Sequence, residues 1–138
     1  MLKYHVVSMK SPVDKSVKYY ARLAPVSPVK LNQLAEAISA ESTVTIHDVK
    51  AVLSALEAEI YRQLRNGYSV RLGDLGSFRP TLSSVGTETA DEFTTSHIKK
   101  VNVRFHSSTK IRFELSKANT SVVFQNQGEL ITAEVEGE

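Results

Sequence analysis

Apolar and polar residues alternate along two short runs near the start of the chain, residues 3–7 and 15–22. A turn-forming cluster, residues 11–14, separates the two runs. Such alternation is typical of half-buried strands, so the pattern predicts a β-hairpin. Its tyrosines are Tyr4, Tyr19 and Tyr20. They could stack on nucleic-acid bases, but we favour packing within the hairpin, because small hairpins need such cover.

Further along the chain the apolar period changes to that of a helix. Prolines 25 and 28 interrupt the first pattern, and apolar residues then recur at helical spacing from Leu31 to Ile38. Ser27 followed by Pro28 is typical of a helix cap and first-turn residue. We therefore expect a short helix that ends near the polar cluster at residues 39–43.

A second and longer helix is predicted from Thr45, a capping residue followed by Asp48 in the first turn. The helix should end at Asn66 and Gly67, where glycine can take the left-handed closing conformation. Its apolar stripe consists of Val49, Val52, Leu53, Leu56, Ile60 and Leu64. One small chain cannot bury so long a stripe beside a short helix unless the sheet or a second copy of the chain covers it. The pattern therefore favours a dimer.

Two strands and a tight turn should follow, because Gly73 and Gly76 separate the alternating runs on either side of them. A return strand is predicted over residues 98–105, after a polar excursion at residues 85–97. On this pair of strands apolar residues alternate with cations and small donors. The predicted ribbon therefore has an apolar face and a basic face.

These residues carry a resemblance to a known family. The run Asp74, Leu75, Gly76, Ser77, Phe78 resembles the Gly-Phe-Gly-Thr-Phe signature of the bacterial histone-like HU and integration host factor proteins. The order of elements, two helices and then the glycine-rich strand turn, is also similar. Overall the chain resembles a divergent HU-like subgroup in which an N-terminal hairpin precedes the HU body.

The resemblance implies an α+β fold. Its parts are an N-terminal β-hairpin, a two-helix hairpin, a β-sheet with a shortened or divergent arm, and a short C-terminal helix. It also implies an intertwined homodimer. We expect one HU-like domain over residues 1–126, with the hairpin extension at 1–24 and the HU-like body at 27–118. Residues 127–138 are expected to be an acidic, disordered tail.

The chain departs from the family in two places. At Ser107 and Ser108 it lacks the Pro-Gly pair of the family, so the run after Thr109 could form the final helix or be extended. At the arm tip, residues 85–97 hold three acids and no Lys or Arg, where the family has a basic tip with an intercalating proline. The acids are Glu88, Asp91 and Glu92. A packing role is favoured for Phe93 over a replacement wedge.

Charge and composition agree with a nucleic-acid partner without requiring one. The 138 residues have a net charge of +2, but residues 1–127 carry 17 basic and 11 acidic side chains, a balance of +6. The chain has no cysteine and no apolar stretch of membrane-spanning length, so we expect a cytoplasmic, nucleoid location. No catalytic motif, metal-ligand spacing or cofactor loop was found.

The sequence therefore predicts a non-enzymatic protein that binds double-stranded DNA as a homodimer, largely without sequence preference. No cofactor, membrane or small-molecule substrate is expected. Contacts to phosphates are assigned to Arg71, Arg79, Thr81, Lys99, Lys100, Arg104, Lys110 and Arg112. The alternative is an HU-fold structural or protein-interaction dimer that has lost DNA binding together with the basic arm.

Overall fold

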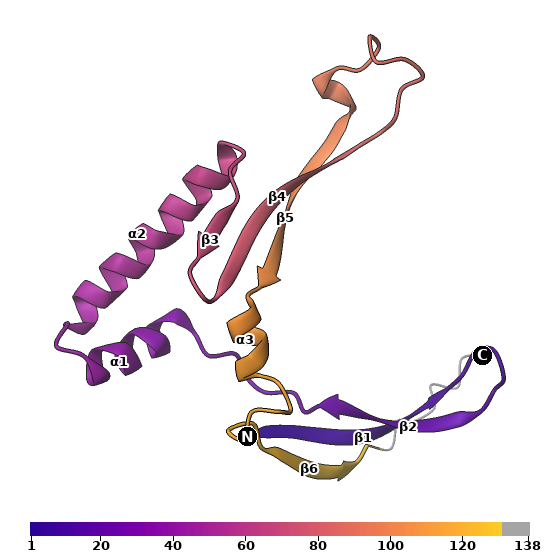
Figure 1. Ribbon diagram of the computed structural model, residues 1–138, viewed down its shortest axis with the longest axis vertical. Coiled ribbons are helices and arrows are strands. Elements are labelled where there is room, and N and C mark those ends of the chain that lie inside the picture. The colour runs from indigo at the N-terminus through magenta and orange to yellow at the C-terminus, as the bar shows by residue number, and fades with distance from the viewer. Residues whose placement is uncertain (131–138) are drawn as a thin grey trace. The chain divides into compact units, whose positions relative to one another are not determined.

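The computed structural model describes residues 1–130 of the chain (Figure 1). Within this range the fold is mixed α and β, with three α-helices and two three-stranded sheets. The residues fall into two compact units. One is Met1–Pro28 with the chain from Glu114 onward, and the other is Val29–Phe113. Over the described residues, no helix has the length and apolar character needed to cross a membrane.

The first unit is a small sheet built on the N-terminal hairpin. Strands β1 (Leu2–Lys10) and β2 (Val17–Leu23) pair antiparallel, which confirms the predicted hairpin. Strand β6 (Phe124–Glu129) adds in parallel to β1, giving the order β2-β1-β6. The tail was therefore predicted to begin too early, because residues 127–129 belong to β6 and Glu129 pairs with Val6 of β1. The remainder of that tail, 131–138, lies outside the described residues.

The hairpin tyrosines do not all pack as expected. Tyr4 is half-buried, but Tyr19 is 62% exposed and Tyr20 is 50% exposed. The two residues lie on opposite faces of β2, which is the outer strand of its sheet over the described residues. The packing interpretation is therefore wrong for these two tyrosines within the described chain.

The second unit begins with two helices, α1 (Leu31–Glu41) and α2 (Ile46–Arg65). The cap of α1 is Lys30 instead of Ser27; its backbone N–H donates to the Gln33 side chain at 2.8 Å. The cap of α2 was predicted correctly: the Thr45 hydroxyl accepts the backbone N–H of Asp48 at 3.3 Å. The end of α2 is also confirmed, since Gly67 follows with φ 84°.

The two helices bury little of their apolar surface. Ala35 of α1 and Val49 of α2 are buried, and they form the core of this unit. Part of the α2 stripe is uncovered: Val52 and Leu56 are exposed, while Leu53, Ile60 and Leu64 are half-buried. Buried apolar area is the main source of folding free energy, so a unit with so small a core depends on further cover.

A sheet of three antiparallel strands follows α2, in the order β3 (Val70–Leu72), β4 (Gly76–Ser84) and β5 (Ile98–Ser107). Strands β4 and β5 form a long ribbon, which extends away from β3 toward a loop (Figure 1). A 3-10 turn (Thr95–His97) lies between that loop and β5.

The chain after β5 forms a short helix, α3 (Thr109–Glu114), so the helical alternative is confirmed. The Ser108 hydroxyl accepts the Ile111 N–H at 3.0 Å at the start of this helix.

Gly76 allows a close approach that a side chain would prevent. It is buried, has φ 153°, and lies opposite Ser107 at the start of the β4–β5 pairing. A Cβ at this position would lie 2.3 Å from the carbonyl oxygen of His106 and 2.6 Å from the Phe105 ring. The contact involves a backbone atom, so relieving it would require the strands to move apart.

We expect Gly76→Ala to lower the free energy of unfolding by about 1–3 kcal/mol, because the added methyl group overpacks the strand junction. Gly86→Ala is the matched control, since nothing lies within 4 Å of a Cβ there. Urea denaturation of both variants measures the difference. An equal effect of the two substitutions would contradict the role given to Gly76.

Candidate nucleic-acid interface

The register of the ribbon gathers cations on one face. Arg79 of β4 pairs directly with Arg104 of β5, and Ser83 pairs with Lys100. Thr81 lies opposite Asn102 on the same side, because side chains two residues apart share a face. At the other end of the ribbon, Ser77 pairs with Arg71 of β3 and with His106 of β5. We call this the ribbon cation face: Arg71, Ser77, Arg79, Thr81, Lys100, Asn102, Arg104 and His106.

Within residues 1–130, the cations of this face have no acidic partners. In the part of the chain that the structure describes, the ion pairs are Arg62 with Glu59 on α2 and Lys110 with Asp74. Arg79, Lys100 and Arg104 are exposed and take part in neither. Like charges directly opposite each other on neighbouring strands are destabilising. The Arg79–Arg104 pair therefore favours an anion bound above it.

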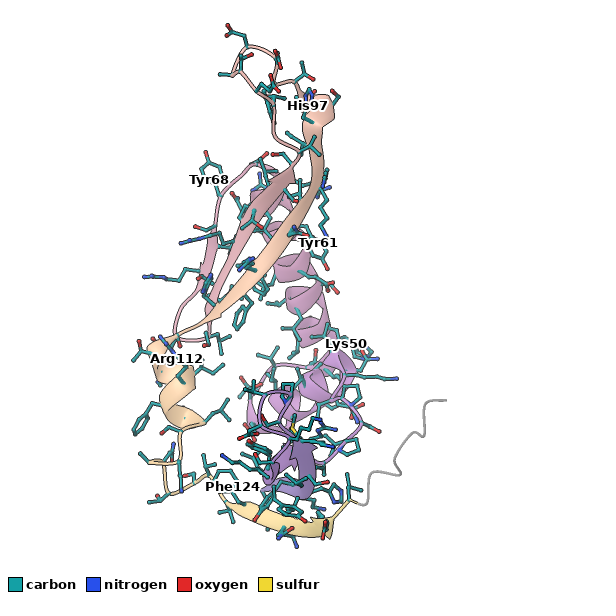
Figure 2. The ribbon with its side chains drawn as sticks, turned by 90° about the vertical axis from the view of Figure 1, so that its right-hand side faces the viewer. Lys50, Tyr61, Tyr68, His97, Arg112 and Phe124 are labelled. Carbon is teal, nitrogen blue, oxygen red and sulfur yellow. The ribbon has the colours of Figure 1, made fainter. Side chains whose placement is uncertain are left out.

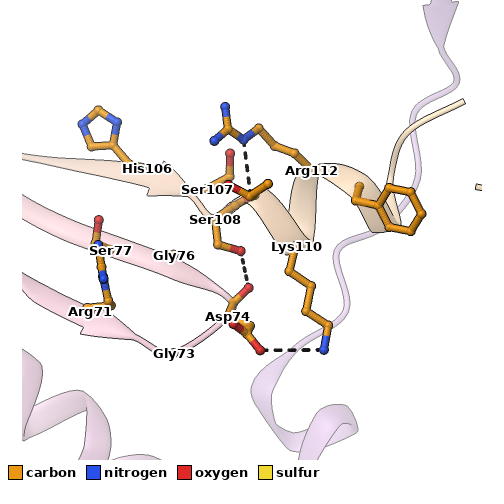
Figure 3. Close-up of a pocket in the computed structure, with 12 residues that line it drawn as sticks. Arg71, Gly73, Asp74, Gly76, Ser77, His106, Ser107, Ser108, Lys110 and Arg112 are labelled. Carbon is orange, nitrogen blue, oxygen red and sulfur yellow. Dashed lines mark hydrogen bonds and ion pairs between the residues drawn. The ribbon is translucent and has the colours of Figure 1, made fainter. Parts of the chain in front are cut away.

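The cation face continues into a hollow of about 800 Å³ beside the turn between β3 and β4 (Figure 3). Arg71, His106, Lys110 and Arg112 line it, together with serine and threonine hydroxyls. The single acid in its lining is Asp74, whose carboxylate lies 3.7 Å from the Lys110 ammonium. The hollow therefore has an excess of positive charge.

Hydrogen bonds hold the walls of this hollow together. The Ser108 hydroxyl donates to the backbone carbonyl of Asp74, which joins the start of α3 to the glycine turn (Figure 3). The Nε of Arg112 donates to the Ser108 carbonyl at 3.3 Å. The Asp74 carboxylate, in the glycine turn, pairs with Lys110 of α3. These contacts place α3 residues beside the sheet.

Most of the sequence-predicted contact residues come together. Arg71, Arg79, Thr81, Lys100 and Arg104 share the ribbon cation face, and Lys110 and Arg112 line the adjoining hollow. Lys99 differs, because it lies in a bulge: Lys100 pairs with Ser83 and Ile98 with Ser84, leaving Lys99 without a partner on β4.

Sequence reasoning missed His106, because it ended the return strand at Phe105. The strand continues to Ser107, so the alternation includes His106 on the cation face. The signal was present in the sequence, since His106 follows Lys100, Asn102 and Arg104 at a spacing of two residues.

The tip of the ribbon is a folded acidic loop. The backbone N–H of Val85 donates to the carbonyl of His97 at 2.9 Å, which closes the loop at its base. His97, at the far end of the ribbon in Figure 2, lies with its ring centroid 5.4 Å from that of Phe93. Phe93 therefore packs locally, as favoured from the sequence. No cluster of potential metal ligands occurs among residues 1–130.

The opposite face of the ribbon is apolar and largely uncovered. Phe78 pairs with Phe105 at a centroid distance of 5.2 Å. Leu82, Val101 and Val103 on the same face are 66%, 64% and 53% exposed. A hollow of about 480 Å³ lies between this face and the end of α2, lined by Tyr61, Leu64, Arg65, Pro80, Val101 and Val103. Figure 2 shows Tyr61 of α2 beside the ribbon.

The sequence and the fold have counterparts among known proteins. The family model described as an HU domain fused to a wHTH, Ig or glycine-rich motif, HU-HIG, matches residues 1–121. The chain belongs to the HU-HIG family. The match covers both the N-terminal hairpin and the ribbon, so the recognised HU resemblance is confirmed.

Among solved structures, the HU-HIG chain is similar to a candidate bacterial DNA-binding protein from Bacteroides vulgatus ATCC 8482, with a TM-score of 0.69 and 15% identity. The alignment covers 95% of this chain and 50% of the other, so the chain spans about half the length of that relative. At this identity the likeness shows the shared fold. No curated protein matches the sequence.

Proposed function

We propose that this HU-HIG protein binds double-stranded DNA as a homodimer, through phosphate contacts and largely without sequence preference. The observation that carries the proposal is the pairing of Arg79 with Arg104 on a face without acids. The membership in an HU-like family supports DNA as the anion. The proposal includes an architectural role in the nucleoid, a cytoplasmic location, and no catalytic activity.

Electrostatics favours a polyanion over a small anion on this face. The cations repeat along the strands from Arg71, through Arg79 and Arg104, to Lys100. Each phosphate neutralised by Lys or Arg releases a counterion, which makes the binding favourable and dependent on salt. The side chains between the cations, Thr81 and Asn102, can donate to phosphate oxygens as well. Contacts of these kinds position a duplex without reading its bases.

The apolar face of the ribbon supports the dimer. A second copy of the chain is the occupant we propose for the hollow beside Val101 and Val103, because both the ribbon and the α2 stripe leave large apolar side chains exposed. Cover by a second copy would enlarge the small core around Ala35 and Val49. The cation face lies on the other side of the strands, so it would stay free in such a dimer.

The acidic tip limits how far DNA is held along the ribbon. Glu88, Asp91 and Glu92 lie between the ends of β4 and β5, beyond the last cations of the ribbon. Phosphates repel these carboxylates, so the proposed contact is restricted to the cation face and the hollow beside it. The proposed complex therefore does not use the tip to wrap the duplex.

Val103→Asp should weaken the dimer by at least about 100-fold, since it buries an unpaired charge at a cost of about 3 kcal/mol. Asn102→Asp is the matched control, because it places the same charge on the neighbouring residue of the opposite face. Sedimentation equilibrium measures both. A Val103→Asp protein with unchanged self-association would rule out this face as the interface.

The double substitution Arg79→Gln with Arg104→Gln tests the DNA-binding face. In a dimer it removes four cations, so the slope of log affinity against log salt should become shallower by about 2 to 4 units. The probe is a fluorescent duplex of about 30 base pairs, titrated at several salt concentrations and read by anisotropy. The control, Lys50→Gln with Lys117→Gln, removes the same charge elsewhere and should leave the slope unchanged.

Two outcomes would count against the proposal. Equal slopes for the double variant and the control would exclude the ribbon cation face. A folded wild-type protein that fails to bind the duplex at low salt would favour the alternative, an HU-fold dimer that interacts with proteins.

Glu88→Lys at the tip should strengthen duplex binding and steepen its salt dependence, because the change replaces repulsion of the phosphates with attraction. Glu36→Lys, an exposed residue of α1, is the matched control for the same change in net charge. If both variants strengthen binding equally, net charge explains the gain and the tip has no specific effect.

A further inference from the structure

The N-terminal hairpin has a charged face that the proposed function does not use. On β2, Lys18, Tyr20 and Arg22 alternate on one side of the strand, opposite Met9, Val7 and His5 of β1. The pairing continues to Lys3, whose carbonyl accepts the N–H of Ala24. Lys3 lies on the same side as His5, because side chains two residues apart on a strand share a face. We call Lys3, Lys18, Tyr20 and Arg22 the hairpin cation face.

The hairpin cation face is accessible. Lys3, Lys18 and Arg22 are exposed, and Tyr20 is 50% exposed. Strand β2 is at the edge of its sheet, and successive side chains on one face of a strand are about 6.6 Å apart. The result is a row in which a phenol hydroxyl stands between two cations.

The charge on the hairpin is mostly positive. Residues 1–24 contain five basic residues and a single acid, Asp14. The Asp14 carboxylate accepts the Ser16 hydroxyl at 2.8 Å and the Ser16 N–H at 3.1 Å, within the turn. These bonds, first of all the one from the hydroxyl, hold the pKa of Asp14 below its usual value. Neither ion pair in the described part of the chain involves a hairpin cation.

We propose that the hairpin cation face is a second phosphate-contacting surface for duplex DNA. The inference rests on the proposed function, since it assigns to the N-terminal unit a share in binding the same polyanion. Lys and Arg provide the charge, and the Tyr20 hydroxyl can donate to a phosphate oxygen. Single-strand binding usually combines a groove with several stacked aromatics, whereas this face presents one tyrosine. The duplex is therefore the occupant that the face fits better.

The opposite side of the same sheet provides internal controls. Tyr19 is 62% exposed there and pairs with Ser8, so it differs from Tyr20 chiefly in the direction of its side chain. Lys10 lies on that side by alternation, and Lys117 lines an apolar hollow there with Leu2, Tyr4, Ala21, Leu23 and Phe124. Removing these two lysines changes net charge without touching the hairpin cation face.

The experiment uses the full chain and a labelled duplex of about 30 base pairs, titrated over a range of salt concentrations. Lys18→Gln with Arg22→Gln should make the salt slope shallower by about 2 units if one hairpin of a dimer contacts DNA, and by about 4 if both do. Lys10→Gln with Lys117→Gln should leave it unchanged. Tyr20→Phe should weaken duplex binding more than Tyr19→Phe, and circular dichroism checks that each variant is folded.

The outcomes separate this inference from the function on which it rests. In one outcome the wild type binds with a steep salt slope, and Lys18→Gln with Arg22→Gln gives the same slope as the control, Lys10→Gln with Lys117→Gln. That result excludes the hairpin surface and leaves the ribbon surface standing. If the hairpin variants weaken binding of a single strand of the same length and leave duplex binding intact, the assignment to duplex DNA is wrong. If the folded wild type binds no duplex at low salt, both proposals fail together.

Discussion

The close approach of β5 to Gly76 is the constraint on which the rest of the second unit, Val29–Phe113, depends. A Cβ at residue 76 would clash with the His106 carbonyl. Because Gly76 has none, the start of β4 can lie directly against the end of β5. The aromatic pair of Phe78 and Phe105, whose rings are tilted by 54°, lies two residues further along. A slip of one residue would transfer every side chain of a strand to the other face. This junction therefore keeps Arg79 and Arg104 on one side of the ribbon and the apolar residues on the other.

The two faces of the ribbon differ in chemistry, and we propose a different partner for each. The core of the second unit, Ala35 with Val49, is too small to account for the apolar residues that the ribbon and α2 expose. A second copy of the chain is the proposed cover for the apolar face, and DNA is the proposed partner of the cation face. The two roles are compatible because alternate side chains of one strand serve them separately.

The hairpin unit repeats this division on a smaller scale. Its edge strand presents Lys18, Tyr20 and Arg22 on one side and exposed Tyr19 on the other. Acids lie in the loops that join these strands, Asp14 in the hairpin turn and Glu88, Asp91 and Glu92 in the ribbon tip, while Glu129 lies on β6. Cations on strand faces and acids in connecting loops make phosphate contact favourable along the strands and unfavourable at the tip.

Local patterns in the sequence determined the hairpin, both helices, the Thr45 cap, the Gly67 helix end and the alternation along the ribbon, because each depends on neighbours a few residues away. Most of the candidate interface was predictable for the same reason. The tertiary structure decided what depends on distant partners: the parallel pairing of β6 with β1, the Asp74–Lys110 ion pair, and the cross-strand meeting of Arg79 with Arg104. It also placed His106 on the cation face, since pairing with Ser77 extends β5 beyond Phe105. Periodicity shows which side chains share a face of one strand, but only the pairing register shows which residues of another strand they meet.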